Sequence, residues 1–108
     1  MNWNNSINRV ELQGRIGTVR ISNCAGNLVA NFSLMTEHTL KTADDKVAVE
    51  TTWHNVAAYK GEGIILDGLT RGVTVHLEGR LRNNRYTAAD GTERIFTEVI
   101  ASSLRIVQ

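Results

Sequence analysis

Aromatic and cationic side chains gather in two stretches of this sequence, and their spacing suits the stacking of flat ligands. Strand alternation over residues 53–59 places Trp53 and Tyr59 on the same face. The second stretch interleaves arginines with small or apolar residues and leads to a third ring; it contains Arg80, Arg82, Arg85 and Tyr86. Bases stack on such rings while Arg and Lys follow phosphates, without needing a particular base sequence. The pattern therefore favours single-stranded nucleic acid as the ligand.

Apolar residues with a period of two predict the strands that position these side chains. The predicted strands cover residues 9–16, 28–35, 47–59, 73–81 and 94–101, followed by an apolar edge at Leu104 and Ile106. In the second of them the inward residues are Leu28, Ala30, Phe32 and Leu34. Gly79 indicates a bulge or a barrel bend, and Asp90-Gly91 is typical of a hairpin turn.

Two connecting segments lack this period. Residues 62–70 place Ile65, Leu66 and Leu69 at helical spacing among glycines, which predicts one or two helical turns. Residues 37–46 are polar and charged, which predicts a mobile connection with a basic tip. Five strands with one short helix between the third and the fourth are the order of an all-β OB-fold, a Greek-key barrel.

Length and composition describe one domain over residues 1–108, with a flexible tail expected over residues 1–6. The net charge of +1 means that any basic surface comes from local clustering. The single cysteine, Cys24, excludes an internal disulfide and is expected to be an unreactive thiol in a reducing compartment. No apolar stretch approaches the roughly 20 residues of a membrane span and no signal-peptide pattern opens the chain, so we expect a cytoplasmic location.

Residue patterns for catalysis or metal binding are missing from the sequence. His38, His54 and His76 lack the spacing of metal ligands, and we expect structural or subunit-interface histidines. No nucleophile has a nearby base, no carboxylates are paired in an apolar frame, and no glycine-rich phosphate loop follows a strand. We therefore expect no enzyme activity, cofactor, metal or small-molecule substrate.

Six short motifs occur in the order found in bacterial single-stranded DNA-binding proteins, a family that the chain resembles from about Ile7 to Val107. The motifs are Asn8-Arg9-Val10, Gly14-Arg15-Ile16-Gly17, Val29-Ala30-Asn31-Phe32-Ser33-Leu34, Thr52-Trp53-His54, Glu78-Gly79-Arg80-Leu81-Arg82, and Asp90-Gly91 followed by Thr97-Glu98-Val99. The resemblance implies sequence-nonspecific binding and protection of single-stranded DNA in replication, repair or recombination, in a cytoplasmic protein associated with the nucleoid.

The resemblance also implies roles for single residues. Trp53, Tyr59 and Tyr86 stand where the family places DNA-stacking aromatics, and Arg82 and Arg85 where it places cations that contact the DNA backbone. The predicted DNA-binding set further contains cations of the arginine stretch and of the basic tip, namely Arg80, Lys41 and Lys46. The family assembles as homotetramers, so we expect a homotetramer, with a dimer as second choice, and an interface role for His54.

The sequence departs from the family pattern at three positions. Leu40 stands where many members place a tryptophan, Asn55 where they often place an arginine, and Asn84 at another commonly basic position. Losing one stacking ring is expected to weaken binding without abolishing it. Trp3 precedes the match, and the sequence leaves open whether it belongs to a tail, packs at an interface or replaces the missing ring.

A second class of function stays open, an adaptor similar to the primosomal OB-fold protein that bridges single-stranded DNA and replication-restart proteins. The near-neutral charge and Leu40 leave room for it, whereas a purely structural OB domain would leave the shared aromatic face without a role. Cellular members of the family usually continue into an acidic tip that recruits partners, and this sequence stops at Gln108 before any such tip. We therefore expect DNA binding without tail-dependent recruitment, whether the natural chain is longer or not.

Overall fold

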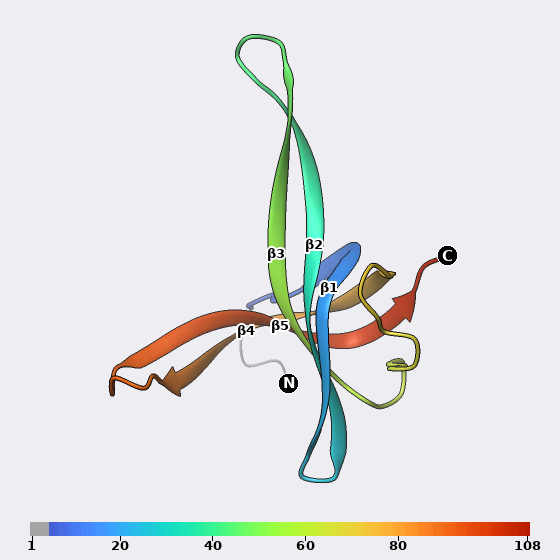
Figure 1. The fold of residues 1–108 in the computed structure, drawn as a ribbon, viewed down its shortest axis with the longest axis vertical. Coiled ribbons are helices and arrows are strands. Elements are labelled where there is room, and N and C mark those ends of the chain that lie inside the picture. The colour runs from blue at the N-terminus through green and yellow to red at the C-terminus, as the bar shows by residue number, and fades with distance from the viewer. Residues whose placement is uncertain (1–4) are drawn as a thin grey trace.

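Five long strands close into one barrel in the computed structural model, which describes residues 5–108 (Figure 1). The strands are β1 (Val10–Cys24), β2 (Asn27–Lys41), β3 (Val47–Tyr59), β4 (Thr74–Thr87) and β5 (Glu93–Ile106). Their order around the barrel is β1-β2-β3-β5-β4, and every neighbouring pair is antiparallel except β3 and β5, which run parallel. This arrangement confirms the predicted all-β class and is consistent with the predicted OB-fold.

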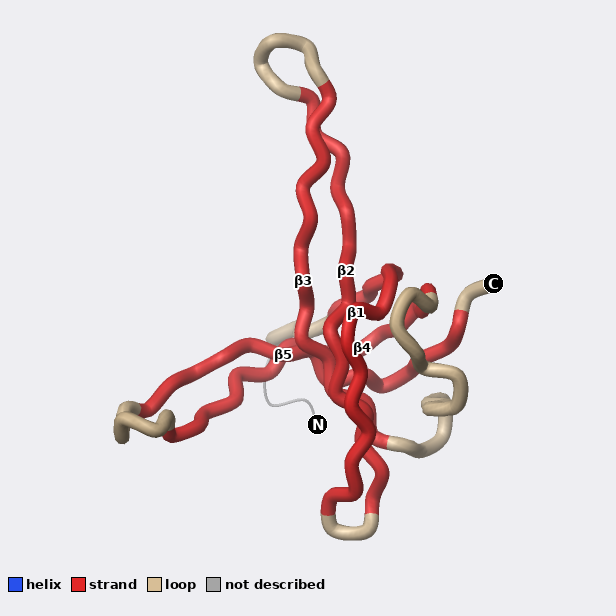
Figure 2. The backbone as a smooth tube through the Cα atoms, in the orientation of Figure 1, coloured by secondary structure: helices blue, strands red, loops and turns tan. Residues whose placement is uncertain are grey.

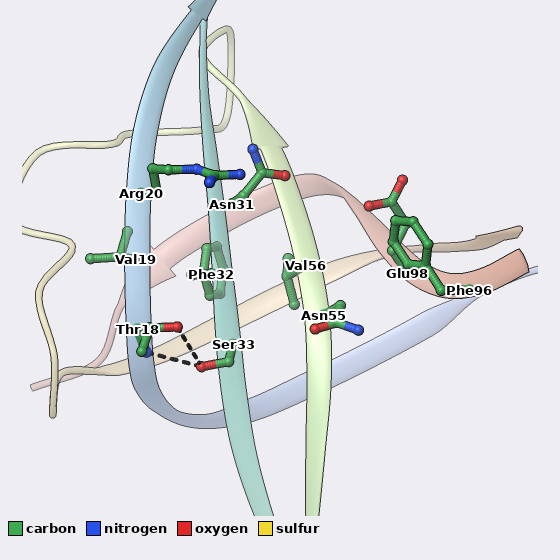
Figure 3. Close-up of a pocket in the computed structure, with 10 residues that line it drawn as sticks. All are labelled: Thr18, Val19, Arg20, Asn31, Phe32, Ser33, Asn55, Val56, Phe96 and Glu98. Carbon is green, nitrogen blue, oxygen red and sulfur yellow. Dashed lines mark hydrogen bonds between the residues drawn. The ribbon is translucent and has the colours of Figure 1, made fainter. Parts of the chain in front are cut away.

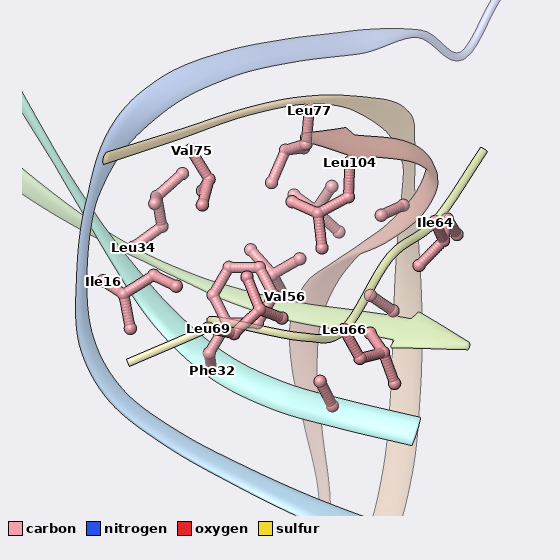
Figure 4. Packing of buried hydrophobic residues seen from close by; sticks show 14 residues of the cluster. Ile16, Phe32, Leu34, Val56, Ile64, Leu66, Leu69, Val75, Leu77 and Leu104 are labelled. Atoms are coloured by element: carbon pink, nitrogen blue, oxygen red, sulfur yellow. The ribbon is translucent and has the colours of Figure 1, made fainter. Parts of the chain in front are cut away.

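Apolar side chains from all five strands fill the barrel (Figure 4). The most completely buried large side chains are Ile16, Leu34, Val75 and Leu77. They lie at the period-two positions predicted from the sequence, because alternate strand residues point to the same side of a sheet. The core therefore uses the inward face of each strand and leaves the outward face of β1, β2 and β3 free for polar side chains.

The helix predicted over residues 62–70 is wrong, since this segment forms turns and the described part of the chain contains no helix. Gly63 and Gly68 take positive φ angles of 79° and 83°, which interrupt any helical run. Ile64 forms bridges with Gly61 and Leu104 instead. The apolar residues of this segment pack into the barrel core instead of forming a helix. Ile64, Leu66 and Leu69 are buried there, whereas Ile65 is exposed.

Strands continue beyond the barrel and form hairpins that project in different directions (Figures 1 and 2). β2 and β3 pair from Val29↔Tyr59 to Lys41↔Val47, so the connection predicted over residues 37–46 is too long: residues 37–41 belong to β2, and only residues 42–46 form the turn. We call residues 36–52 the β2–β3 arm and residues 82–98 the β4–β5 arm. Each arm is paired throughout by backbone hydrogen bonds, which positions its side chains relative to the barrel.

Two residues predicted to point inward are exposed because they lie past the end of the barrel wall. Leu28 sits near the tip of the β1–β2 hairpin and keeps 38% of its surface exposed. Leu81 follows the predicted bulge, which the register confirms between Glu78 and Gly79, and keeps 48%. A side chain at Gly79 would place its Cβ 2.1 Å from the Ile100 carbonyl oxygen, so only glycine fits this bend.

The predicted Asp90-Gly91 turn is confirmed at the tip of the β4–β5 arm. Asp90 Oδ1 accepts hydrogen bonds from the Thr92 backbone nitrogen at 3.0 Å and from the Thr92 hydroxyl at 2.6 Å. These bonds lower the pKa of Asp90, and Gly91 supplies the positive φ of 84° that the turn requires.

Within residues 5–108, no helix of the length and apolarity needed to cross a bilayer occurs. Trp3 lies outside the described residues.

Candidate nucleic-acid interface

The register of β2 and β3 places two of the predicted stacking rings on one face. Trp53 pairs with Met35 and Tyr59 with Val29, all at positions of the same parity, whereas His54 pairs with the buried Leu34 on the other face. Trp53 keeps 58% of its surface exposed and Tyr59 keeps 41%. The shared, solvent-accessible face predicted from the alternation is therefore confirmed.

Trp53 rests on β1, where a glycine makes room for its ring. A Cβ at Gly17 would lie 2.5 Å from Cζ3 of Trp53 and 2.7 Å from Oγ of Ser33. Ser33 is itself held, because its Oγ accepts a hydrogen bond from the Thr18 backbone nitrogen at 2.9 Å. The indole thus has one supported edge and a large exposed surface, which is the geometry of a pre-organised stacking platform.

Tyr86 contacts a second ring that the sequence reasoning missed. Its ring centroid lies 5.8 Å from that of Phe96, with an interplanar angle of 64°, an edge-to-face pair across β4 and β5. Phe96 pairs with Asn84 in the register, two positions before Tyr86. The packing limits the motion of the tyrosine, which still keeps 48% of its surface exposed.

Arg82 is anchored by a buried carboxylate. Its guanidinium donates to Oε1 of Glu98 at 2.6 Å, and Glu98 is only 6% exposed. Asn84 Nδ2 donates to the same oxygen at 3.3 Å. The hydrogen bond that Arg82 donates to Glu98 raises the pKa of Arg82 above its ordinary value, loss of solvent contact opposes the rise, and Tyr59 adds to it. Tyr59, Arg82 and Glu98 therefore form one cluster.

A groove with a cavity of about 370 Å³ lies between β1, β2, β3 and β5 (Figure 3). Its lining consists of Thr18, Val19, Arg20, Asn31, Phe32, Ser33, Asn55, Val56, Phe96 and Glu98, of which Phe32 and Val56 also belong to the barrel core. At one end Ser33 lies beside Trp53, and at the other Phe96 packs against Tyr86. The groove thus joins the surroundings of all three predicted stacking rings.

None of the groove residues was predicted as a site residue, although the sequence holds a signal for some of them. Asn31 and Ser33 are polar positions between the inward Ala30, Phe32 and Leu34, so the outward face of this strand is polar. Phe96 and Glu98 gave no such signal, because their place depends on β5 pairing in parallel with β3. Asn55 lines the groove at a position where the family often has arginine, which leaves this wall uncharged.

None of the predicted cations lines the groove itself; Arg82 contacts the lining residue Glu98, and the others lie farther away. Arg85 Nη1 is 3.4 Å from Oε1 of Glu93, and both side chains are exposed. Lys41 pairs with Asp45 at 3.0 Å, and Lys46 with Asp44 at 3.9 Å. The tip predicted to be basic therefore carries as many carboxylates as ammonium groups, and a hydrogen bond from Thr42 lowers the pKa of Asp44. Arg80 lines a separate cavity of about 190 Å³ beside Asn8 and Ser102.

His54 lies on the core-side face at the base of the β2–β3 arm. Its Nε2 is 2.8 Å from the Thr36 hydroxyl, and partial burial lowers the pKa of the imidazole. His76 is paired with Glu11 at 2.8 Å on the barrel wall. Among residues 5–108, no three His, Cys, Asp or Glu side chains are grouped so as to hold a metal ion.

Comparisons with known proteins agree with this geometry. The profile described as the single-strand binding protein family matches residues 7–107. The chain is 33% identical to a single-stranded DNA-binding protein of Neisseria meningitidis and 32% to one of Xanthomonas axonopodis pv. citri. Each alignment covers 94% of this chain but 60% and 58% of those relatives, so the chain spans about three-fifths of their length.

Solved structures show the same fold. A Plasmodium falciparum SSB in complex with ssDNA superposes with a TM-score of 0.82 at 28% identity, and the match covers 100% of both chains. A deletion mutant of the single-stranded DNA binding protein from Thermus aquaticus gives a TM-score of 0.77 at 18% identity, over 94% of this chain and 51% of the other, and supports the fold alone.

Proposed function

Because the chain belongs to the single-strand binding protein family, we propose that it binds and protects single-stranded DNA with little dependence on sequence. Bases stack on Trp53, Tyr59 and Tyr86, while cations at the groove, Arg82 foremost, contact the phosphates. The proposed setting is DNA replication, repair or recombination in the cytoplasm, at the nucleoid. No catalytic step is part of this function.

The observation that carries the proposal is the groove that links the three rings. Its ends lie beside Trp53 and Tyr86, and Glu98 in its wall binds Arg82, whose neighbour is Tyr59. A strand of DNA laid along it would meet a ring at each end and polar groups between them. The likeness to a structure solved with ssDNA over the whole chain supports this path.

Fluorescence titration with oligothymidylate tests the proposal. Stacking on Trp53 is expected to quench the indole emission, and the affinity is expected to fall as salt rises because phosphate contacts release counterions. Trp53→Phe is the control, since Trp3 also emits. The proposal would be refuted if, at low salt, the protein neither retains the oligonucleotide nor loses indole emission when it is added. A preference for duplex DNA would contradict the stacking mechanism.

We further propose that the chain assembles as a homo-oligomer, a tetramer rather than a dimer, with His54 at an interface between subunits. The support is the family membership and the position of His54 on the core-side face of an arm, where the Thr36 hydrogen bond fixes its ring. Light scattering is expected to give about four times the 12.0 kDa mass of the chain, and a smaller mass for His54→Ala. A monomer at every concentration would overturn this proposal.

One observation favours the adaptor as a second candidate function. Four of the cations predicted to bind DNA, Arg82, Arg85, Lys41 and Lys46, are paired with carboxylates. Such pairing lowers the attraction for phosphate, as suits a protein that bridges DNA and replication-restart proteins. Retention of a restart protein by DNA only when this chain is present would support the adaptor, and DNA affinity that is unaffected by ring removal would favour it over the main proposal.

A further inference from the structure

The side chain of Asn8 ties the segment before β1 to β4, at the place where the β4–β5 arm leaves the barrel. Its Nδ2 donates a hydrogen bond to the Leu81 carbonyl oxygen at 2.8 Å, and its Oδ1 accepts one from the Leu81 backbone nitrogen at 2.9 Å. Pairing of β1 with β4 ends at Val10 and Gly79, and the same register, continued, would set Asn8 opposite Leu81. The side-chain amide therefore makes the two bonds that the backbone of an antiparallel partner would make there.

The other side-chain ties in this region end on the barrel side of the bulge in β4. Arg9 lies 3.7 Å from the Glu78 carboxylate, with both side chains exposed, and the Ser102 hydroxyl donates to the Glu78 carbonyl oxygen at 3.1 Å. The bulge follows Glu78, whereas Leu81 lies past it. The bonds of Asn8 are therefore the ones that cross the bend from the barrel to the arm.

The base of the arm is held differently at its two edges. Leu81 pairs with Val99, and Val99 pairs in turn with Val56 of β3, so the β5 edge is fixed by a neighbouring strand. At the β4 edge, Asn8 takes the place of such a strand. A bulge bends its strand, and a cavity of about 190 Å³ lined in part by Asn8 and Gly79 lies beside this bend. Packing there leaves the angle open, so the hydrogen bonds set it.

We propose that Asn8 is a positioning residue for DNA binding, because its two bonds to Leu81 fix the direction in which the β4–β5 arm leaves the barrel. This inference rests on the proposed binding of single-stranded DNA. The arm carries Tyr86, so its direction sets the distance from Tyr86 to Trp53 on β3. A strand that stacks on both rings binds more tightly when this distance is fixed beforehand, since the arm then needs no ordering on binding.

Distances between two spin labels test the direction of the arm without DNA. One label is attached to Cys24, the exposed cysteine at the tip of the β1–β2 hairpin, and the other to Ala89→Cys, an exposed position near the tip of the β4–β5 arm. Labelled chains are diluted with unlabelled ones, so that distances within one chain are measured. Asn8→Asp keeps the acceptor but loses the donor to Leu81, and is expected to broaden the distance distribution.

Asn5→Asp is the matched control, because it makes the same chemical change three residues earlier. Asn5 is also exposed and forms no hydrogen bond with another described residue, so the distribution is expected to stay narrow. Asn8→Ala removes both bonds without adding charge and serves as the second variant if Asn8→Asp does not fold. Asn8 and Leu81 lie at the surface, so the barrel core stays intact in either variant. A distribution unchanged by both Asn8 variants would overturn the inference and leave the proposed function standing.

Two oligothymidylates, of about 6 and about 16 nucleotides, then separate positioning from general stability, as one OB fold binds roughly 4–16 nucleotides. The long oligomer spans the groove from Trp53 to Tyr86, whereas the short one is bound without the arm. Asn8→Asp is expected to weaken the long oligomer by about fivefold relative to Asn5→Asp, the lower end for one stacked base, and to leave the short one unchanged.

Combining Asn8→Asp with Tyr86→Ala completes the test. Asn8→Asp is expected to lose most of its effect on the long oligomer in this background, because the ring that it positions is gone. Equal losses for both oligomers, undiminished when Tyr86 is absent, would overturn the positioning role. Binding of neither oligomer by the unmodified protein would instead refute the proposed function, which the label distances do not test.

Discussion

The two long arms both carry cations but differ in what holds them. In the β2–β3 arm, Lys41 and Lys46 are exposed and pair with aspartates of the same turn. In the β4–β5 arm, Arg82 is held by the buried Glu98 from the neighbouring strand. Exposed pairs contribute about 0–1 kcal/mol and exchange readily with other ions, whereas a cation bonded to a buried partner keeps one place.

The arms also differ in where their rings lie. Trp53 directly follows the β2–β3 arm and lies against Gly17, and on the arm itself Val47 and Val49 are exposed without an aromatic neighbour. The β4–β5 arm carries the Tyr86–Phe96 pair along its length. In the proposed binding of single-stranded DNA, the β4–β5 arm and Trp53 supply the fixed contacts, and the tip of the β2–β3 arm supplies exposed charges.

Removing the rings is expected to have the largest effect. Trp53→Ala is expected to weaken oligothymidylate binding by about 1–3 kcal/mol, the contribution of one stacked base. Tyr86→Ala is expected to weaken binding by less than Trp53→Ala does, because Phe96 remains at the same place and can take over part of the stacking. Filter binding with both variants measures the difference. A larger loss for Tyr86→Ala would show that the β4–β5 arm alone sets the affinity.

Two arginine substitutions compare an ion pair with a buried carboxylate, Arg82–Glu98, with an exposed ion pair, Arg85–Glu93, in the same arm. Arg82→Ala leaves the Glu98 carboxylate with Asn84 as its hydrogen-bond donor, and is expected to lower the free energy of unfolding by about 1–3 kcal/mol. Arg85→Ala breaks an exposed pair with Glu93 and is expected to change the free energy of unfolding by less than about 0.5 kcal/mol.

Urea unfolding measures both values. Adding Glu98→Gln to Arg82→Ala is expected to restore part of the lost stability, because the unpaired charge is then gone. Equal effects of the two arginine substitutions would remove the distinction between anchored and exposed cations.

Adding a ring to the β2–β3 arm tests which of its faces meets DNA. The register places Val49 on the face of Trp53, and Leu40 on the face of His54. Val49→Trp is therefore expected to raise the affinity for single strands by about 1 kcal/mol, and Leu40→Trp to raise it less. Fluorescence titration of both variants gives the comparison. A gain for Leu40→Trp alone would show that DNA follows the core-side face of the arm.

The smallest expected effect is a pH dependence at the base of the β2–β3 arm. Burial lowers the pKa of His54 in the folded protein below its ordinary value of 6.5, so the unfolded chain takes up this proton first as the pH falls. The free energy of unfolding is then expected to decrease from about pH 7.5 to about pH 5.5. His54→Gln is expected to show a shallower decrease in urea unfolding, and an identical decrease would assign the effect to other groups.

Much of the fold was predictable from the sequence, because alternation records which side of each strand faces the core. Ile16, Leu34 and Val75 occupy inward positions in the pattern and are buried. The pattern also predicted the bulge at Gly79 and the Asp90-Gly91 turn, where backbone geometry leaves few alternatives to these residues. The same alternation placed Trp53 and Tyr59 on one face, and the structure confirms that both are exposed there.

Other features depended on the tertiary structure, because they join residues far apart in the chain. Spacing alone suggested a helix over residues 62–70, but three apolar side chains can reach a barrel core from turns as well as from a helix. The place of Phe96 and Glu98 in the groove follows from the closure of β3 onto β5, and the pairing of Arg82 with Glu98 follows from the register between β4 and β5. The sequence alone therefore determined which side chains point outward, and only the closed barrel decided which of them meet, because strand pairing across the barrel sets those distances.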